Sequence, residues 1–513
     1  MRNSDDEAIK ISVSAELVII ADAEFEIVKG MNNEFYAYPK SGPRVGRTLS
    51  GTNNSLVSDL RSKYFNIYSK VPRKSQLEEA VEILKINADA QEPVNIHIRF
   101  AFFEHKIYVD LGSVTGQAIE IDSTGWRVVD VPPVYFRRTR LNTALPTPEK
   151  GGDIKTLFQI INVPENLQDL LVGWLVACCF EKIPKPILGL DGEQGSGKSN
   201  TTTNLNRLLD PSEAILKGAP ENTSEWLMIA QAAYVVSLDN ISRLTPQFSD
   251  ALCRACTGES KIARELYTDS DVLVHSFRRV IILNGINLSD TRDDLSDRLL
   301  PISLPVIEGR KKKYEADLEN LWLLEYPRIL GALYDLCSVV LRELESTQVE
   351  ELPRMADFAR ILATLDRVLG TSSFNEYVKM IQNAAATIID NDPFLKSLEE
   401  SIHTTWKGSA NELKDYLCRV SFRRDDRGYP QTAKDFTDKL KRSAPTLKKR
   451  GWIVEKLDAN NHRHVIIWVL TPPASIASMN SENNINSCEV ENKVNPGTPS
   501  SPSSQGQIDW SKF

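Results

Sequence analysis

The stretch Gly192-Glu-Gln-Gly-Ser-Gly-Lys-Ser199 decides the fold of this 513-residue chain. It has the pattern G-x-x-x-x-G-K-S. The apolar run at residues 187–190 predicts a strand before it, and residues 201–209 predict a helix after it. Its three glycines allow the backbone dihedrals that turn successive N–H groups towards an anion. The sequence therefore predicts a phosphate-binding loop between a strand and a helix.

This loop is expected to bind ATP. Lys198 can reach the outer phosphates, Ser199 can hold Mg²⁺, and the helix that starts there points its positive end at the same charge. A Gly/Ser-rich surface loop is the alternative, but it does not explain a Lys-Ser pair at this offset. The predicted nucleotide-binding residues are Gly192, Glu193, Gln194, Gly195, Ser196, Gly197, Lys198, Ser199 and Asn200.

Composition narrows the class of protein. The apolar fraction of 41% and the charged fraction of 25% are those of an ordinary soluble chain, and the length predicts about three domains. The net charge of −8 means that any contact with nucleic acid needs a local basic patch. The acidic start shows no secretory pattern, and the apolar residues 167–180 are too few to span a bilayer. We therefore expect a cytoplasmic protein without a membrane partner.

Residues 1–150 are predicted to form a mixed α+β domain. Its strand-like segments lie at residues 15–20, 94–100, 106–110, 118–122 and 126–130, and residues 76–86 have helical spacing. No catalytic motif stands out, so the role of this domain is left open. Cys253 and Cys256 form the one C-x-x-C pair, which lacks the further ligands of a zinc site and is expected to pack as apolar groups.

Residues 151–308 alternate strands and helices, which predicts a parallel sheet covered by helices on both faces. Residues 234–239 end in Asp239, a carboxylate that can hold Mg²⁺ through water. Asn240 follows where many ATPases have a glutamate, and asparagine cannot act as a base. Either Glu193 or Glu259 takes that role, or Asn240 only positions water and turnover is slow.

Two further motifs follow in the core. Residues 279–284 predict a strand that ends in Asn284, whose amide can bond a γ-phosphate or its water. Residues 292–298 place two arginines on a short helix. An arginine brought to a neighbour's nucleotide would stabilise charge in the transition state, whereas an internal ion pair is the alternative. Residues 262–276 predict a β-hairpin.

The order of these motifs resembles the AAA+ ATPase core of phage and mobile-element replication proteins, in the superfamily 3 and minichromosome-maintenance-like helicases that are often joined to primases. The resemblance implies that Asn284 is the sensor 1 residue and that Arg298 is an arginine finger acting on the next subunit, with Arg292 second. It also implies that the hairpin contacts DNA. The cations expected there are Lys261, Arg264, Arg278 and Arg279, although its tip carries Asp269 and Asp271.

The last third of the chain is predicted to hold three regions. Residues 309–405 form a helical lid, in which Arg328 and Arg354 are candidate lid arginines. Residues 406–471 read as helices followed by a hairpin, typical of a winged helix, with Lys448, Lys449, Arg450 and Arg463 as DNA contacts or a solvated face. Residues 472–513 are expected to be disordered, and their aromatic end is a hypothetical docking motif for a replication partner.

The predicted function is an ATP-dependent DNA helicase or translocase that replicates a phage or mobile element. The resemblance implies a homo-hexameric ring on single-stranded or forked DNA. Its ATP would lie between subunits, with Lys198, Ser199, Asp239 and Asn284 from one and Arg298 from the next. A non-unwinding AAA+ switch or loader is the alternative, and Asn240 favours it. A small-molecule kinase would need neither Asn284, Arg298 nor a basic third domain.

Overall fold

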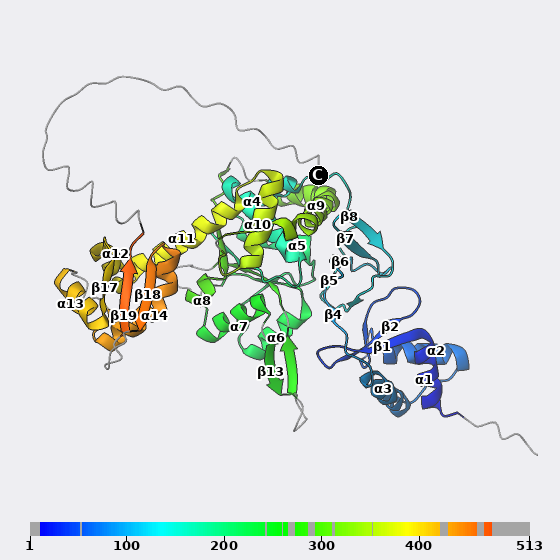
Figure 1. The fold of residues 1–513 in the computed structure, drawn as a ribbon. Coiled ribbons are helices and arrows are strands. Elements are labelled where there is room, and N and C mark those ends of the chain that lie inside the picture. Colours follow the sequence, from blue (N-terminus) through cyan, green and yellow to red (C-terminus); the bar gives the residue numbers. More distant parts are fainter. Residues whose placement is uncertain are drawn as a thin grey trace, which may run out of the picture. The chain divides into compact units, whose positions relative to one another are not determined.

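The computed structural model describes residues 11–51, 54–241, 244–258, 260–264, 272–276, 278–285, 293–309, 313–350, 352–420, 429–458 and 466–473. The described residues form two compact units, and the boundary between them along the chain lies between Phe374 and Asn375 (Figure 1). The domain boundaries predicted near residues 150, 308 and 405 lie inside these units, so the finer division into five parts stays a prediction.

The first unit begins with three helices and a small antiparallel sheet. These are α1 (Val13–Glu24), β1 (Phe25–Lys29), β2 (Phe35–Pro39), β3 (Arg47–Thr48), α2 (Leu56–Tyr68) and α3 (Lys74–Asp89). The prediction of a strand at residues 15–20 is wrong, because this segment lies within α1. Leu17, Ile20 and Ala21 are all buried, at the spacing of one helix face. A short apolar run fits a strand and a helix equally well, and packing against α3 decides for the helix.

A four-stranded antiparallel sheet follows. Its strands run in chain order, β5 (Phe100–Phe103), β6 (Lys106–Asp110), β7 (Ala118–Asp122) and β8 (Gly125–Val129), and β4 (Ile96–His97) pairs in parallel with β9 (Tyr135–Phe136). The strands predicted at residues 106–110 and 118–122 are confirmed. The segment predicted as one strand at residues 94–100 is divided between β4 and β5. Arg99 lies between them with a left-handed φ of 63°, a conformation that interrupts the hydrogen bonding of a strand.

The core of the first unit is a five-stranded parallel sheet, as the sequence predicted. Its order is β11 (Leu216–Lys217), β12 (Val235–Leu238), β15 (Val280–Asn284), β10 (Ile187–Asp191) and β16 (Leu299–Ser303). The residues of β12 and β15 are all buried, which explains their continuous apolar sequences. Helices connect these strands: α5 (Lys198–Leu209), α6 (Thr223–Ala232), α7 (Pro246–Thr257) and α8 (Asp293–Ser296).

The predicted hairpin is present as β13 (Ser260–Arg264) paired antiparallel with β14 (Val272–Ser276). Lys261 and Arg264 lie on β13. Asp269 and Asp271 lie outside the described residues.

Helices flank the parallel sheet in the chain before and after it. They are η1 (Ile154–Gln159), α4 (Glu165–Cys179), α9 (Glu315–Glu343), η4 (Leu344–Ser346) and α10 (Ala356–Leu369). Helix α11 (Ser373–Asn391) contains the boundary between the two units and belongs mostly to the second. Helix α9 lies against residues 149–152 so closely that a Cβ on Gly331 would come within 1.8 Å of the Glu149 carbonyl. Across the described parts of the chain, every helix is too short or too polar to cross a membrane.

The second unit has helices and a three-stranded antiparallel sheet. Its elements are α12 (Pro393–Ser401), β17 (Trp406–Ser409), α13 (Ala410–Val420), α14 (Ala433–Lys449), β18 (Ile453–Asp458) and β19 (Ile466–Thr471), with sheet order β17-β19-β18. The two helices and the hairpin predicted here are present, and β17 is an addition that the sequence did not indicate. Phe394, Phe436, Trp452 and Trp468 form its core.

Candidate functional site

The loop between β10 and α5 has the backbone that its glycines predicted. Gly192, Gly195 and Gly197 have φ values of 141°, 85° and 82°, which other residues rarely adopt. A Cβ on Gly192 would also lie 2.6 Å from the carbonyl oxygen of Leu304. Helix α5 begins directly after the loop, so its first N–H groups have no partner within the helix and face this loop.

Side chains of α5 and of the segment before α4 donate hydrogen bonds to the backbone carbonyls of the loop. The ammonium of Lys198 donates to the carbonyls of Gly192, at 2.5 Å, and Glu193, at 3.0 Å. Asn162, which the sequence did not indicate, donates to the Ser196 carbonyl at 2.9 Å. The side-chain amide of Asn200 donates to the carbonyl of Ile160 at 3.1 Å, so it tethers the end of η1 in this structure.

The structure brings the two predicted Mg²⁺ ligands together. The hydroxyl oxygen of Ser199 lies 3.4 Å from Oδ1 of Asp239. Mg²⁺ prefers oxygen ligands and takes a few of them from protein and the rest from water and phosphates, so this pair fits the ion. Within the described part of the chain, the hydroxyls of Ser196 in the loop and Thr201 on α5 are buried without a hydrogen-bond partner. Both hydroxyls can still form hydrogen bonds.

Asn284 lies at the carboxyl end of β15 and is buried. Its Nδ2 donates to the hydroxyl of Thr202 on α5 at 3.1 Å, and its Oδ1 accepts from the backbone N–H of Asn240 at 2.8 Å. Asn240 has a left-handed φ of 54°. Asparagine tolerates that conformation better than glutamate does, which gives a structural reason for its presence after Asp239.

Arg298 lies at the opposite edge of the sheet from the loop. Its carbonyl accepts from the N–H of Ile187, the first residue of β10, at 2.7 Å, whereas the loop follows the last residue of that strand. A nucleotide in the loop of the same chain is therefore out of its reach. The buried guanidinium pairs with Asp294, which also pairs with Arg354 at 3.0 Å. Arg292 and Glu259 lie outside the described residues.

The other predicted arginines have internal partners. Arg278 donates to the carbonyl of Thr257, the last residue of α7, at 2.9 Å, and Arg279 donates to the carbonyls of Ala230 and Arg278. Burial lowers the pKa of the Arg279 guanidinium to about 10. These two half-buried arginines satisfy carbonyls, including one at a helix end that lacks an intrahelical donor. Their role as cations at the hairpin base stays a prediction.

The candidate lid arginines are likewise engaged away from the loop residues. Arg354 pairs with Asp294 and Asp297, and Arg328 lies 3.9 Å from Glu149.

Three of the predicted cations of the second unit, Lys448, Lys449 and Arg450, lie at the C-terminal end of α14. Lys448 and Arg450 are exposed, and Arg450 lies 3.2 Å from the carboxylate of Glu399. Lys449 is half-buried, and Arg463 lies outside the described residues.

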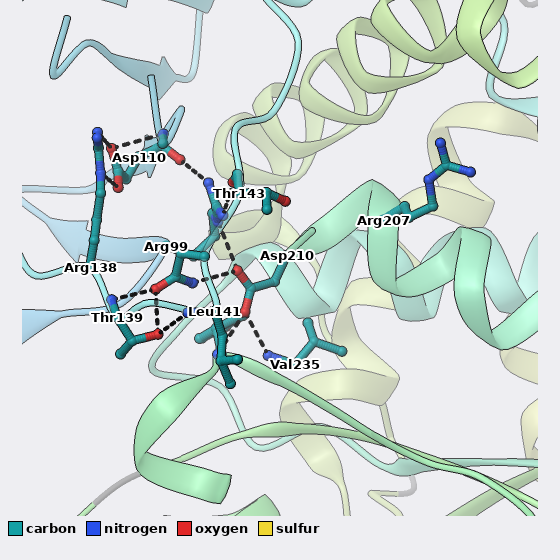
Figure 2. A network of polar contacts seen from close by, with 12 residues as sticks. Arg99, Asp110, Arg138, Thr139, Leu141, Thr143, Arg207, Asp210 and Val235 are labelled. Carbon is teal, nitrogen blue, oxygen red and sulfur yellow. Dashed lines mark hydrogen bonds and ion pairs between the residues drawn. The ribbon is translucent and has the colours of Figure 1, made fainter. Parts of the chain in front are cut away.

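A buried polar network joins the N-terminal sheet to the helix that follows the loop (Figure 2). Arg99 Nε donates to Oδ1 of Asp210, the residue that ends α5, at 2.9 Å. The same guanidinium donates to the carbonyls of Asp110, at 2.8 Å, and Thr143, at 2.7 Å. The second oxygen of Asp210 accepts from the N–H of Val235, the first residue of β12, at 3.2 Å. One ion pair thus connects the end of α5, the start of β12 and the N-terminal sheet.

Two family models match this chain. Residues 154–386 match the replication protein of actinomycete integrative conjugative elements, and residues 394–481 match the C-terminal domain of the same protein, AICE RepA. The two ranges together hold more than half of the chain. The parallel sheet with its loop is thus the core of a replication protein of a mobile element. The chain belongs with the replication proteins of actinomycete integrative conjugative elements.

Solved structures resemble the chain only distantly. The apo C-terminal region of NrS-1 has a TM-score of 0.37 at 11% identity, over 88% of this chain and 98% of that chain. A second apo structure of this region has the same TM-score and covers 90% of this chain and 100% of that chain. A JCV helicase with a bound acetamide compound has a TM-score of 0.25 at 15% identity, over 46% and 64% of the two chains. No curated protein matches the sequence.

Proposed function

We propose that this replication protein is an ATP-dependent DNA helicase or translocase with an AAA+ P-loop core. The observation that carries the proposal is the convergence of Lys198, Ser199, Asp239 and Asn284 at the carboxyl edge of one parallel sheet. Ligands of parallel α/β sheets bind at this edge, where the strands end. The match to a mobile-element replication protein supports DNA as the partner.

In this proposal the loop holds the triphosphate of ATP. Lys198 exchanges its two carbonyl partners for the outer phosphates, and the N–H groups of the loop and of α5 point at the same charge. Ser199 and Asp239 hold Mg²⁺, which neutralises phosphate charge. Asn284 orients the attacking water or the γ-phosphate while it fixes the backbone of Asn240.

Arg298 completes the site of a neighbouring subunit. Because it lies at the edge opposite its own loop, it can act on a nucleotide only across an interface, which favours a ring such as a hexamer. In the single chain its guanidinium pairs with Asp294, so assembly must pull Arg298 out of this pair or shift the helix α8 that carries Asp294.

DNA is held by two parts of the chain in this proposal. Lys261 and Arg264 on β13 contact the strand in the ring. The second unit acts as a winged helix through Lys448, Lys449, Arg450 and Arg463. The C-terminal tail docks a replication partner.

The test is ATP hydrolysis and displacement of a labelled strand from forked DNA. Lys198→Ala should abolish both. Lys150→Ala is the matched control, because that lysine is exposed and pairs with Asp335 rather than with the loop. Turnover that persists in Lys198→Ala would overturn the assignment of the loop.

A second candidate is a non-unwinding AAA+ switch or loader. The observation that favours it is Asn240, which occupies the place of a general base and cannot accept a proton. ATP-dependent DNA binding by the wild-type protein without strand displacement would support this candidate against the helicase.

A further inference from the structure

The second half of α2, its connection to α3 and the first residue of α3 carry cations and aromatic rings without an acid. We call residues 61–74 the basic turn. The chain has no carboxylate between Asp59 and Glu78. The five cations of the basic turn are Arg61, Lys63, Lys70, Arg73 and Lys74. On a protein with net charge −8, such a segment is a local region of positive potential.

Large apolar side chains of the basic turn face solvent. Phe65 is 52% exposed, Tyr68 41% and Val71 67%. Exposed aromatic rings interleaved with cations are the surface that single-stranded nucleic acid uses, because bases stack on the rings while phosphates meet the cations.

Three of the cations are available to a ligand. Arg61, Lys70 and Arg73 are exposed and make no ion pair within the described part of the chain. By contrast, Lys63 pairs with Glu24, and Lys74 lies 3.5 Å from Glu78.

Helix α2 places three of the exposed groups on one face. Arg61, Phe65 and Tyr68 are spaced by four and three residues, so they follow one face of α2. The ring of Tyr68 packs on that of Tyr64 with centroids 4.6 Å apart, and the Tyr64 hydroxyl donates to Glu16 at 2.7 Å. The Tyr68 ring therefore has a packing partner before a ligand arrives, which lowers the entropy lost on binding.

The turn itself is also constrained. Ser69 ends α2 in a left-handed conformation, with φ of 51°, and its N–H donates to the Phe65 carbonyl at 2.8 Å. Pro72 is buried beneath the turn, and its ring fixes the backbone there. Lys70 and Arg73 therefore extend from a rigid support.

The composition of the neighbouring helix disfavours binding of double-stranded DNA in its major groove. In a helix-turn-helix the second helix enters the major groove. Here that helix is α3, and its exposed face carries Glu78, Glu79 and Glu82, which would repel phosphates.

We propose that the basic turn is a binding site for single-stranded DNA. Arg61, Lys70 and Arg73 contact phosphates, and two bases stack on Phe65 and Tyr68. The site goes beyond the proposed function, because it requires neither ATP nor the parallel sheet. It assigns a role to the N-terminal region.

Photocrosslinking locates the contact. The full-length protein is irradiated without ATP on oligo-dT that carries 5-iododeoxyuridine, and the crosslinked peptides are identified by mass spectrometry. We expect peptides that contain Phe65 or Tyr68. Crosslinks confined to other parts of the chain would overturn the proposal.

Fluorescence anisotropy on labelled oligo-dT measures the energetics. Replacing Phe65 and Tyr68 by alanine should weaken binding by about tenfold for each ring. Arg61→Gln with Arg73→Gln should reduce the slope of log affinity against log salt by about 0.7 for each lost phosphate contact. Every variant is also made with Lys448→Gln and Arg450→Gln, so that the second unit does not mask the loss.

Matched controls come from α3 of the same subdomain. Lys85→Gln and Ile86→Ala change an exposed cation and an exposed apolar residue on the acidic helix, and neither should affect binding. Equal losses in these controls, or competition by polyglutamate as strong as by oligo-dT, would overturn the assignment to single-stranded DNA. Lys198→Ala should bind as wild type does, so a failure of the ATPase proposal leaves this result interpretable.

Discussion

Asn284 Oδ1 accepts a hydrogen bond from the backbone N–H of Asn240 at 2.8 Å, so the residue after Asp239 is fixed by the strand beside it. The second end of the same amide donates to Thr202 on α5. One buried side chain thus ties the ends of two strands to the helix that follows the loop. The side chain of Asn240 is exposed, whereas its backbone has a left-handed φ. We infer that the hydrogen bond to Asn284 requires this backbone conformation rather than the Asn240 side chain.

Substitution of Asn240 separates its backbone from its side chain. Asn240→Gly keeps the left-handed backbone and should leave ATP turnover unchanged. Asn240→Glu supplies a base and should raise turnover at least about tenfold, less than the 10²–10⁴ of a well-placed base because glutamate is strained there. Steady-state ATP hydrolysis measures both. Loss of turnover in the glycine variant would mean that the Asn240 side chain itself positions water.

Mixing experiments test the role of Arg298. In a one-to-one mixture with Arg298→Ala subunits, about half of the normal sites face a substituted neighbour and should lose about 10³-fold in turnover. Arg342→Ala is the matched control, because Arg342 lies on α9 and pairs with Glu343 rather than with Asp294, so it should leave each normal site unchanged. If turnover per normal site stays constant at every mixing ratio, both the shared site and the ring-shaped assembly are contradicted.

Lys185 predicts a pH-dependent stability. It is buried, with its ammonium 3.2 Å from the Tyr234 hydroxyl, and burial lowers the pKa of this lysine from 10.5 to about 8. Keeping it charged in the folded state costs about 3 kcal/mol at neutral pH. Between pH 8 and 10.5 the unfolded chain binds more protons, so this penalty fades as pH rises.

Lys185→Met should therefore raise the free energy of unfolding at pH 7 and lose most of that advantage by pH 10. Urea denaturation at the two pH values measures the difference. Tyr234 keeps its own hydrogen bond to the Cys178 carbonyl at 2.7 Å, so the substitution leaves its hydroxyl partnered. An advantage that stays constant across this range would place the pKa of Lys185 at its ordinary value.

The pair of Arg99 and Asp210 predicts the strongest loss of stability. Arg99→Met leaves the Asp210 carboxylate buried without its cation, which should cost about 3–5 kcal/mol in the free energy of unfolding. The double variant Arg99→Met with Asp210→Asn removes the uncompensated charge and should recover part of the loss. Thermal or urea unfolding gives both values, and equal stability of the two variants would contradict the argument.

Local sequence determined the loop and the strands around it. Glycines at positions that require positive φ, continuous apolar runs and the order of the motifs are properties of neighbouring residues. They predicted the parallel sheet, with Lys198 and Ser199 at the start of the helix after the loop and Asp239 and Asn284 at strand ends. The helical spacing of Leu17, Ile20 and Ala21 was also present, but the short apolar run at residues 15–20 fits both periods and was predicted as a strand.

The tertiary structure determined the hydrogen-bond and ion-pair partners of the charged side chains. Arg99 pairs with Asp210 across 111 residues of chain, because a buried charge needs a partner and the fold brings this carboxylate to it. Arg278 donates to the carbonyl at the end of α7, a partner that the local sequence did not indicate. The basic turn became visible only once α2 had buried Leu60 and Tyr64 and left Phe65 and Tyr68 outside. Sequence alone established which groups the chain possesses, and packing selected which of them remain free to act.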